Sequence, residues 1–299
     1  MTNYLGEIIA IGTAICWAIT STAFASAGKK IGSLSLNIIR LWFAFIFLFI
    51  FTWITRGIPY PIDAGWDTWK WLLLSGLIGF VMGDLFLFEA FVRIGARISM
   101  LIFASVPPMS ALLAYFILGD TMTMIQIIGM IVTIFGISIV ILTKGNKINK
   151  KKIKLAHPVV GVLLAFGGAF GQSLGYIVGK MGLGDYNAFA ATQIRVSAAI
   201  VGFVIVVTVR GGWPSIGRAF KQKKAMISTI IGSVFGPFIG VSLSLLALKY
   251  TSPGVASTLM AITPILLIPV AIFYYKEKMP FKEILGAFVA IVGVAIMFI

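Results

Sequence analysis

Asp84 is the acidic residue that lies deepest within an apolar stretch of this chain. It follows Gly83 inside the stretch 71–91, which has the length of about 20 residues that crosses a bilayer. An ionised carboxylate at such depth is costly unless it faces water or a partner charge, so an acid in this position indicates a functional site. Asp84 therefore suits proton coupling or a counter-charge for a cationic solute. The structural alternative is a hydrogen-bonded carboxyl that only fixes helix contacts.

Glu89 lies in the same stretch, nearer to its end. Arg93 follows four residues later, which places both side chains on one helical face, where the guanidinium can satisfy the carboxylate. Both readings, a binding residue and a plain surface ion pair, stay open for Glu89.

Two further groups of polar side chains recur at helical spacing. Thr13, Trp17 and Thr20 share one face of the first apolar stretch, and Gln172 and Tyr176 share a face of another. An aromatic ring with hydroxyl groups at mid-membrane depth suits a neutral or aromatic metabolite. The candidate binding residues are therefore Thr13, Trp17, Thr20, Asp84, Glu89, Gln172 and Tyr176.

The residue types needed for covalent or metal chemistry are scarce. His157 is the single histidine and lies beside Pro158, so the sequence predicts no histidine-based metal site and no catalytic triad. There is no phosphate-binding loop for ATP, and Cys16 is the single cysteine. We therefore expect a protein that is not an enzyme and that needs no cofactor.

The composition places the chain in a bilayer. Hydrophobic residues make up 60% of it and charged residues 11%, against about a quarter charged in soluble domains. The net charge of +15 comes from cations in short gaps between apolar stretches. Cations in such gaps report membrane topology, so we expect lipid and a small molecule as partners and no nucleic acid. The sequence leaves the oligomeric state open.

Ten stretches are long and apolar enough to be membrane-spanning helices. They cover residues 5–26, 36–55, 71–91, 98–118, 122–143, 158–179, 187–209, 226–248, 255–275 and 281–299.

The second half of the chain repeats the first. An offset of 157 residues places Pro107 on Pro264, Asp120 on Glu277, Gly129 on Gly286 and Gly136 on Gly293. The same offset places Gly79 on Gly236 and Gly83 on Gly240, and a slightly smaller one places Arg40 on Arg195. A period this long indicates two half-domains rather than a solenoid.

Each half holds five of the ten stretches. An odd number makes the second half enter the membrane from the opposite side, which predicts an all-α membrane protein of two inverted five-helix repeats. Residues 1–143 and 158–299 form the repeats, and the basic segment 144–157 links them. Inverted repeats are typical of secondary transporters, with the binding site at the repeat interface near the midplane.

The repetition serves as an internal control for the polar residues. Arg40, Arg195, Asp120 and Glu277 occur in both halves and are interpreted as scaffold, with the arginines reaching to the headgroups. Asp84 differs, because Val241 occupies its place in the second half. Glycines four apart in stretches 158–179 and 226–248 predict close helix packing, with a substrate-facing groove as the alternative.

The distribution of Lys and Arg predicts the orientation. Of the 24 such residues, 18 lie in the gaps after the odd-numbered stretches and four in the gaps on the opposite side, while Arg40 and Arg195 lie within stretches. Because short cytoplasmic loops are rich in Lys and Arg, the gaps after the odd-numbered stretches are expected in the cytoplasm. Both termini are then expected on the outer side of the cell membrane.

The chain resembles the EamA-type transporters of the drug/metabolite transporter superfamily. The likeness rests on Ala-Ile-Cys-Trp ending at Trp17, on Arg40, and on proline followed by an acid and a glycine pair in both halves. It implies ten helices, an inverted repeat and a central cavity lined by helices 1, 3, 4, 6, 8 and 9. It also implies transport of small metabolites, commonly export. These transporters usually have cytoplasmic termini, unlike the orientation predicted above.

We therefore expect a secondary transporter, an exporter of a small organic metabolite or drug-like solute, working by alternating access with proton coupling as one option. An integral membrane enzyme and a passive small-solute channel are the alternatives.

Overall fold

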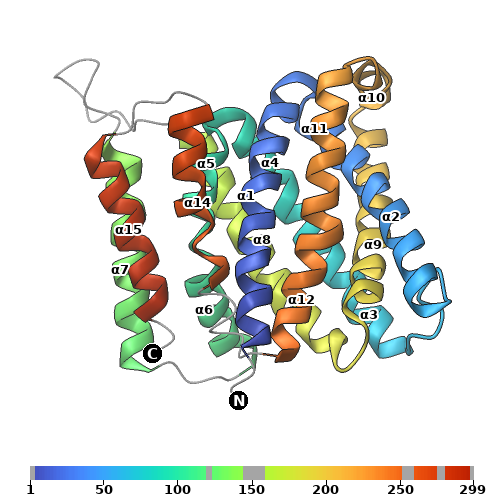
Figure 1. Cartoon of the computed structure of the whole chain (residues 1–299), viewed down its shortest axis with the longest axis horizontal. Coiled ribbons are helices and arrows are strands. Elements are labelled where there is room, and N and C mark those ends of the chain that lie inside the picture. Colours follow the sequence, from blue (N-terminus) through green and yellow to red (C-terminus); the bar gives the residue numbers. More distant parts are fainter. Residues whose placement is uncertain (1–3, 119–122, 144–158, 251–258, 275–279, 297–299) are drawn as a thin grey trace.

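The computed structural model describes residues 4–118, 123–143, 159–250, 259–274 and 280–296. Within these ranges the chain forms helices and no strands, and most helices run side by side (Figure 1). The predictions that involve Asp120, Glu277 and the linker 144–157 lie outside the described residues. The helices are α1 (Leu5–Ile31), α2 (Ser33–Arg56), α3 (Trp66–Gly76), α4 (Asp84–Ile94), α5 (Ala96–Phe103), α6 (Val106–Leu118), α7 (Met124–Thr143), α8 (Val159–Leu183), α9 (Ala188–Val209), α10 (Trp213–Phe220), α11 (Lys223–Ser233), α12 (Val241–Tyr250), α14 (Thr263–Pro269) and α15 (Phe281–Ile296), with π-helical segments η1 (Leu77–Gly83), η3 (Val234–Gly240) and η4 (Val270–Tyr274).

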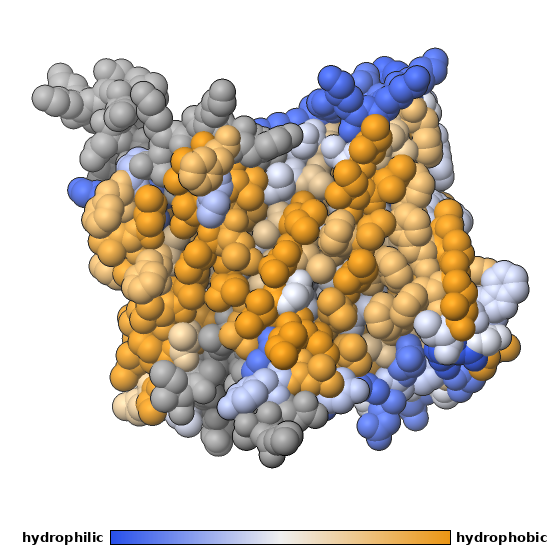
Figure 2. Space-filling view, in the orientation of Figure 1, coloured by the Kyte–Doolittle hydropathy of each residue, from blue (hydrophilic) through white to orange (hydrophobic). Residues whose placement is uncertain are grey.

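Seven helices in the described residues are long and apolar enough to cross a membrane. Their side chains form an apolar band across the molecule, with hydrophilic residues gathered at its two ends (Figure 2). The prediction of an all-helical membrane protein is therefore confirmed. The spans are Leu5–Ile31, Ser33–Arg56, Trp66–Ile94, Ala96–Ile117, Val159–Leu183, Ala188–Val209 and Lys223–Ala247.

Two of these spans contain a π-helical centre. In the first, α3 continues through η1 into α4, and in the second, α11 continues through η3 into α12. The two π-helical segments are both seven residues long, and the offset of 157 places η1 on η3. Each contains two glycines, which tolerate the distorted backbone of a π-bulge.

Helix α8 packs against α3, η1 and α4 along its glycine stripe. A Cβ atom added at Gly175 would lie 2.9 Å from the Cα of Gly79, and one at Gly171 would lie 2.8 Å from the Cα of Gly83. The hydroxyl of Ser75 donates a hydrogen bond of 2.6 Å to the carbonyl of Gly175. The glycines therefore allow the close backbone packing that the sequence predicted.

Helix α1 packs against α11 and η3 in a matching way. A Cβ atom added at Gly236 would lie 2.7 Å from Cγ2 of Thr20, and one at Gly232 would overlap the ring of Phe24. Thr20 donates a hydrogen bond to the carbonyl of Gly232. The two packing regions use equivalent positions. In the first region Ser75, Gly79 and Gly83 contact Gly179, Gly175 and Gly171, respectively. In the second region their equivalents Gly232, Gly236 and Gly240 contact Phe24, Thr20 and Cys16, respectively.

Helices α7 and α15 form a close pair whose contacts are reciprocal. Gly136 approaches the backbone of Ala290, and Gly293 approaches the backbone of Thr133. The offset of 157 converts the first contact into the second, because Gly136 corresponds to Gly293 and Thr133 to Ala290. Equivalent patches that exchange partners in this way are the contact pattern of a two-fold relation.

The prolines mark equivalent helix starts. Pro107 lies in the first turn of α6, which begins after a break at Ala104 and Ser105, and Pro264 lies in the first turn of α14. Proline is tolerated there because the N–H groups of a first turn have no partner within the helix, so the lack of one costs no hydrogen bond.

Candidate functional site

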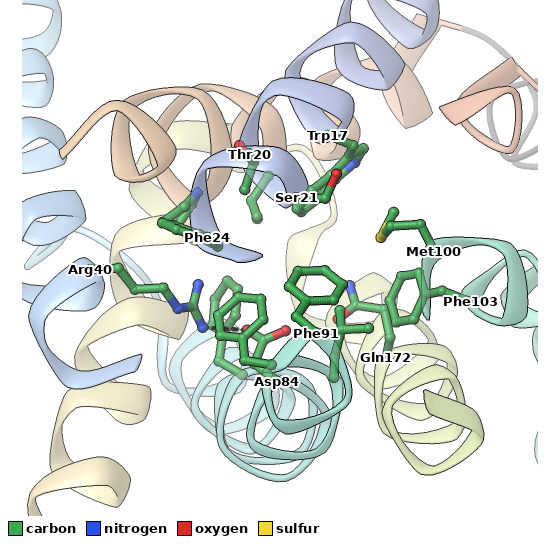
Figure 3. Close-up of a pocket in the computed structure, with 15 residues that line it drawn as sticks. Trp17, Thr20, Ser21, Phe24, Arg40, Asp84, Phe91, Met100, Phe103 and Gln172 are labelled. Atoms are coloured by element: carbon green, nitrogen blue, oxygen red, sulfur yellow. Dashed lines mark hydrogen bonds and ion pairs between the residues drawn. The ribbon is translucent and has the colours of Figure 1, made fainter. Parts of the chain in front are cut away.

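A small cavity of about 30 Å³ lies among six of the spans, with room for about two water molecules. Most of its wall is aromatic or aliphatic, and its polar groups are two hydroxyls, one amide and one ion pair (Figure 3). Among the described residues, its lining comes from α1, α2, α5, α8 and the two π-containing spans. These include the regions that the family resemblance implied, apart from helix 9, and add α2. The polar lining residues are Thr20, Ser21, Arg40, Asp84 and Gln172.

Asp84 and Arg40 form a buried ion pair at this cavity. Nη2 of Arg40 lies 2.5 Å from Oδ2 of Asp84, and their side chains are 3% and 10% exposed. Figure 3 shows the guanidinium pointing toward the carboxylate. Asp84 is the first residue of α4, directly after η1, so the π-helical segment sets its direction.

Arg40 is held from several sides. Its Nε donates a hydrogen bond of 3.1 Å to the side chain of Asn37, whose amide in turn donates to the backbone carbonyl of Asp84 at 3.4 Å. Its guanidinium carbon lies 4.4 Å from the ring centre of Phe88 and 5.9 Å from that of Phe80. Cation–π contacts of this kind are strongest in desolvated positions. Arg40 is thus a fixed part of the site.

The prediction that the two arginines reach to the headgroups is wrong. Arg40 is 2% exposed and Arg195 is fully buried. Their helices turn these side chains toward the centre of the bundle, because the acid and the aromatic rings that attract a guanidinium lie there. The position of an arginine along its helix does not show whether its side chain points to the headgroups or to the centre of the bundle.

Arg195 and Arg40 both lie near the ring of Phe80. The guanidinium carbon of Arg195 is 5.0 Å from the ring centre of Phe80. None of its three side-chain nitrogens has a hydrogen-bond partner among the described residues. Asp84 and Tyr176 lie within electrostatic range. The site therefore holds two buried cations around one ring and one paired carboxylate.

Four of the seven candidate residues line the cavity together. Trp17 and Thr20 enter from α1, Asp84 from α4 and Gln172 from α8 (Figure 3). These residues lie far apart in the sequence, so the sequence pattern identified side chains that the fold brings to one place. Their role in binding stays a prediction.

The other three candidates lie away from the cavity wall. Thr13 is buried and donates to the carbonyl of Ile9 in its own helix at 2.8 Å. Glu89 accepts hydrogen bonds from Ser33 at 2.5 Å and from Arg93 at 2.8 Å, which is the ion pair predicted for it. Tyr176 is half-buried on α8, near Arg195.

Sequence reasoning missed Asn37 and most of the aromatic wall. Asn37 is three residues before Arg40, so helical spacing could have placed the two on one face. Phenylalanines are too common in an apolar chain to be singled out in this way. The aromatic lining residues are Trp17, Phe24, Phe80, Phe88, Phe91 and Phe103.

A second polar cluster lies at the end of the bundle, where Arg56 is the last residue of its span and Asp63 and Tyr186 lie outside the spans. Arg56 binds Asp63 at 2.5 Å, and the hydroxyl of Tyr186 donates to Asp63 at 2.8 Å. Burial, followed by the hydrogen bond to Asp63, raises the pKa of Tyr186 to about 12. Burial acts to raise the pKa of Asp63, but the hydrogen bond from Tyr186 and the charge of Arg56 outweigh it and lower that pKa. This cluster joins the α2–α3 connection to the residues before α9.

The fold and the cavity define a multi-pass helical membrane protein with a polar site at its centre. The model of the EamA-like transporter family matches residues 4–142 and 159–299. Because the match covers almost the whole chain, the protein belongs to this family and is a membrane transporter.

Two curated relatives carry transporter names. The chain is 25% identical over 296 residues to an uncharacterized transporter of Archaeoglobus fulgidus, covering 97% of this chain and 96% of the relative. It is 27% identical over 136 residues to the uncharacterized transporter YyaM of Bacillus subtilis, which covers 46% of this chain and less than half, 43%, of the relative's length.

The fold also has a counterpart among solved structures. One crystal structure aligns with this chain at a TM-score of 0.62 and 15% identity, covering 98% of this chain and 96% of the other. This likeness concerns the fold alone.

Proposed function

We propose that this chain is a secondary transporter that moves a small organic solute by alternating access. The observation that carries the proposal is the small central cavity, which side chains of the first and second halves of the chain line together with a buried ion pair. Ligand sites with mostly apolar walls and a few convergent polar groups are typical of small-molecule recognition.

The architecture that we propose is ten spans in two inverted five-helix repeats, 1–143 and 158–299, joined by the linker 144–157. Three observations support it. The family model matches two segments that correspond to these halves. The π-helical segments η1 and η3 are equivalent by the offset of 157. The contacts of α7 with α15, and of α8 and α1 with the π-containing spans, are reciprocal between the halves.

A cavity of about 30 Å³ is too small for a drug-sized solute, so the site would have to widen to admit one. Rocking of one half against the other would open the site to each side in turn, as in other inverted-repeat transporters. The glycine contacts between α8 and η1, and between α1 and η3, lie where such a movement would occur.

Asp84 is the residue through which protons would be coupled to transport. Protonation of its carboxylate would remove the charge that Arg40 binds, and the two halves could then rearrange. A buried charge is costly without its partner, so the charge of Asp84 and the position of Arg40 depend on each other.

We propose that transport is directed out of the cell, because members of the family commonly export small metabolites. We place the protein in the cell membrane with α10 on the cytoplasmic side. Helix α10 lies at the opposite end of the bundle from the start of α1 (Figure 1), and the segment around it carries Arg210, Arg218, Lys221, Lys223 and Lys224.

The test is solute flux into proteoliposomes that contain the purified protein. The panel contains four aromatic solutes that differ in charge: phenylacetate is an anion, phenethylamine a cation, tryptophan a zwitterion and 2-phenylethanol neutral. We expect saturable flux of at least one solute, with accumulation when a proton gradient is imposed. Flux that does not saturate and never exceeds equilibration, with or without the gradient, would indicate a passive channel. Chemical conversion of a solute without movement would indicate a membrane enzyme.

A further inference from the structure

Arg195 is a buried cation that has no counter-ion of its own in the part of the chain that the structure describes. Its exposed fraction is 0%, and its Nε, Nη1 and Nη2 atoms have no hydrogen-bond partner among the described residues. A guanidinium stays charged in proteins and carries five N–H donors. An unpaired charge in such a position is costly, so its retention indicates that something binds to it.

The acid nearest to this group is already engaged. Asp84 is within electrostatic range of Arg195, but its carboxylate is paired at 2.5 Å with Arg40. Arg40 is further fixed by Asn37 and by Phe88. Counted over the described residues, two guanidinium groups and one carboxylate leave a net charge of one positive unit at this site.

Comparison of the two halves shows which group is missing. Arg40 and Arg195 occupy equivalent positions, and the residue equivalent to Asp84 is Val241. The first half therefore has an arginine with its acid, whereas the second half has the arginine alone. Val241 lines the cavity, so the place of the missing carboxylate faces the space in which a solute would bind.

The wall between Arg195 and the cavity is thin. Phe80 contributes to the cavity lining and also lies against the guanidinium of Arg195. Gly79 has no side chain in this region: a Cβ atom there would lie 3.3 Å from Nη2 of Arg195 and 3.7 Å from Oε1 of Gln172. Both Gly79 and Phe80 belong to η1, and π-helical segments of this kind often mark functional positions. A shift of the Phe80 ring would bring Arg195 into contact with the cavity.

We propose that the central site binds an organic monoanion, a solute with one carboxylate and an aromatic or apolar body, and that Arg195 receives the carboxylate. The solute would supply the acid that the second half lacks, and the aromatic wall would hold its apolar body. This inference rests on the proposed function, because it names the substrate class of the same site.

The experiment measures binding to the purified protein in detergent by thermal shift and by calorimetry. Phenylacetate is the probe, with phenylacetamide as the neutral isostere and phenethylamine as the cation. We expect phenylacetate to stabilise the protein and the two other compounds to have little effect. Arg195→Gln should weaken phenylacetate binding about 30-fold or more, as expected for removal of one partner of a buried charge pair. Arg218→Gln in the exposed helix α10 is the matched control and should bind normally.

A second variant tests the missing acid directly and does not depend on the stability of Arg195→Gln. Val241→Asp places a carboxylate at the position equivalent to Asp84, where it would pair with Arg195. We expect this variant to keep its fold and to lose phenylacetate binding, whereas Val241→Asn keeps binding because an amide cannot neutralise the guanidinium.

Three outcomes would overturn the inference. They are preferential binding of phenethylamine, equal binding of phenylacetate and phenylacetamide, and unchanged phenylacetate binding in both Arg195→Gln and Val241→Asp. Each of them leaves the proposed transport intact if the flux panel still shows accumulation of another solute. Absence of any flux would instead refute the proposed function itself.

Discussion

Nη2 of Arg40 lies 2.5 Å from Oδ2 of Asp84, and both side chains are buried at the centre of the helix bundle. The two residues come from neighbouring spans, and each neutralises the charge that the other brings out of water. A change to one of them therefore leaves the other as an unpaired buried charge.

This relationship predicts the stability of single and double variants. Asp84→Leu and Arg40→Leu should each lower the free energy of unfolding by about 3–5 kcal/mol, because each leaves a buried charge without its partner. The double variant Arg40→Leu/Asp84→Leu should be more stable than either single variant. Denaturant unfolding in detergent, followed by tryptophan fluorescence, measures the three values. A double variant that loses the sum of the two single effects would show that the residues do not interact.

The same pair predicts a transport phenotype. Asp84→Asn keeps the shape of the carboxyl group but cannot release a proton, so this variant should retain solute exchange and lose accumulation driven by a proton gradient. Flux per folded molecule in proteoliposomes over a range of pH is the measurement. Accumulation at the wild-type level across that range would exclude Asp84 as the coupling residue.

The close approach of α8 to η1 predicts the effect of a single methyl group. Gly171→Ala should destabilise the protein by about 1–3 kcal/mol, because the new Cβ would lie 2.8 Å from the Cα of Gly83 and would force two backbones apart. Gly12→Ala in α1 is the matched control, since a Cβ there meets no atom within 4 Å. The control should be neutral or slightly stabilising, because alanine favours helix. Equal effects of the two substitutions would contradict the packing described for α8.

The orientation can be tested with introduced cysteines, because the natural Cys16 is the single one and is buried. In a Cys16→Ala background, Arg218→Cys should be protected from an impermeant thiol reagent applied to intact cells. Asp67 lies in the first turn of α3, and α3 lies at the opposite end of the bundle from α10 (Figure 1), so Asp67→Cys should be labelled. The reverse labelling would show that this chain has the cytoplasmic termini usual in its family.

The cluster of Tyr186, Asp63 and Arg56 predicts a response to alkaline pH. The pKa of Tyr186 is raised to about 12 in the folded protein, from 10.0 for an ordinary tyrosine. The folded state therefore holds the phenolic proton more tightly, and this contribution is complete below pH 10 and is lost as the pH rises toward 12. Asp63→Asn should bring the Tyr186 pKa closer to 10, as measured by NMR of ring-labelled tyrosine with Tyr186→Phe for assignment. An unchanged pKa in Asp63→Asn would show that Asp63 has no part in the shift.

Much of this protein can be predicted from the sequence because its information is local or periodic. Apolar stretches of about 20 residues predict helices in a bilayer regardless of their neighbours. The offset of 157 predicts that two segments have the same local structure, and η1 and η3 agree with it. A carboxylate such as Asp84 is also conspicuous in an apolar stretch, because its cost does not depend on the details of packing.

The tertiary structure decided which polar groups meet. Arg40 and Asp84 are 44 residues apart, and only the packing of α2 against α4 turns the guanidinium inward rather than to the headgroups. Arg195 is fully buried and has no hydrogen-bond partner among the described residues, which depends on the positions of η1 and α8 around it. Sequence position determines how deep a residue lies in its helix, whereas helix rotation and packing determine what its side chain contacts. The contacts of Arg40, Asp84 and Arg195 could therefore be learned only from the tertiary structure.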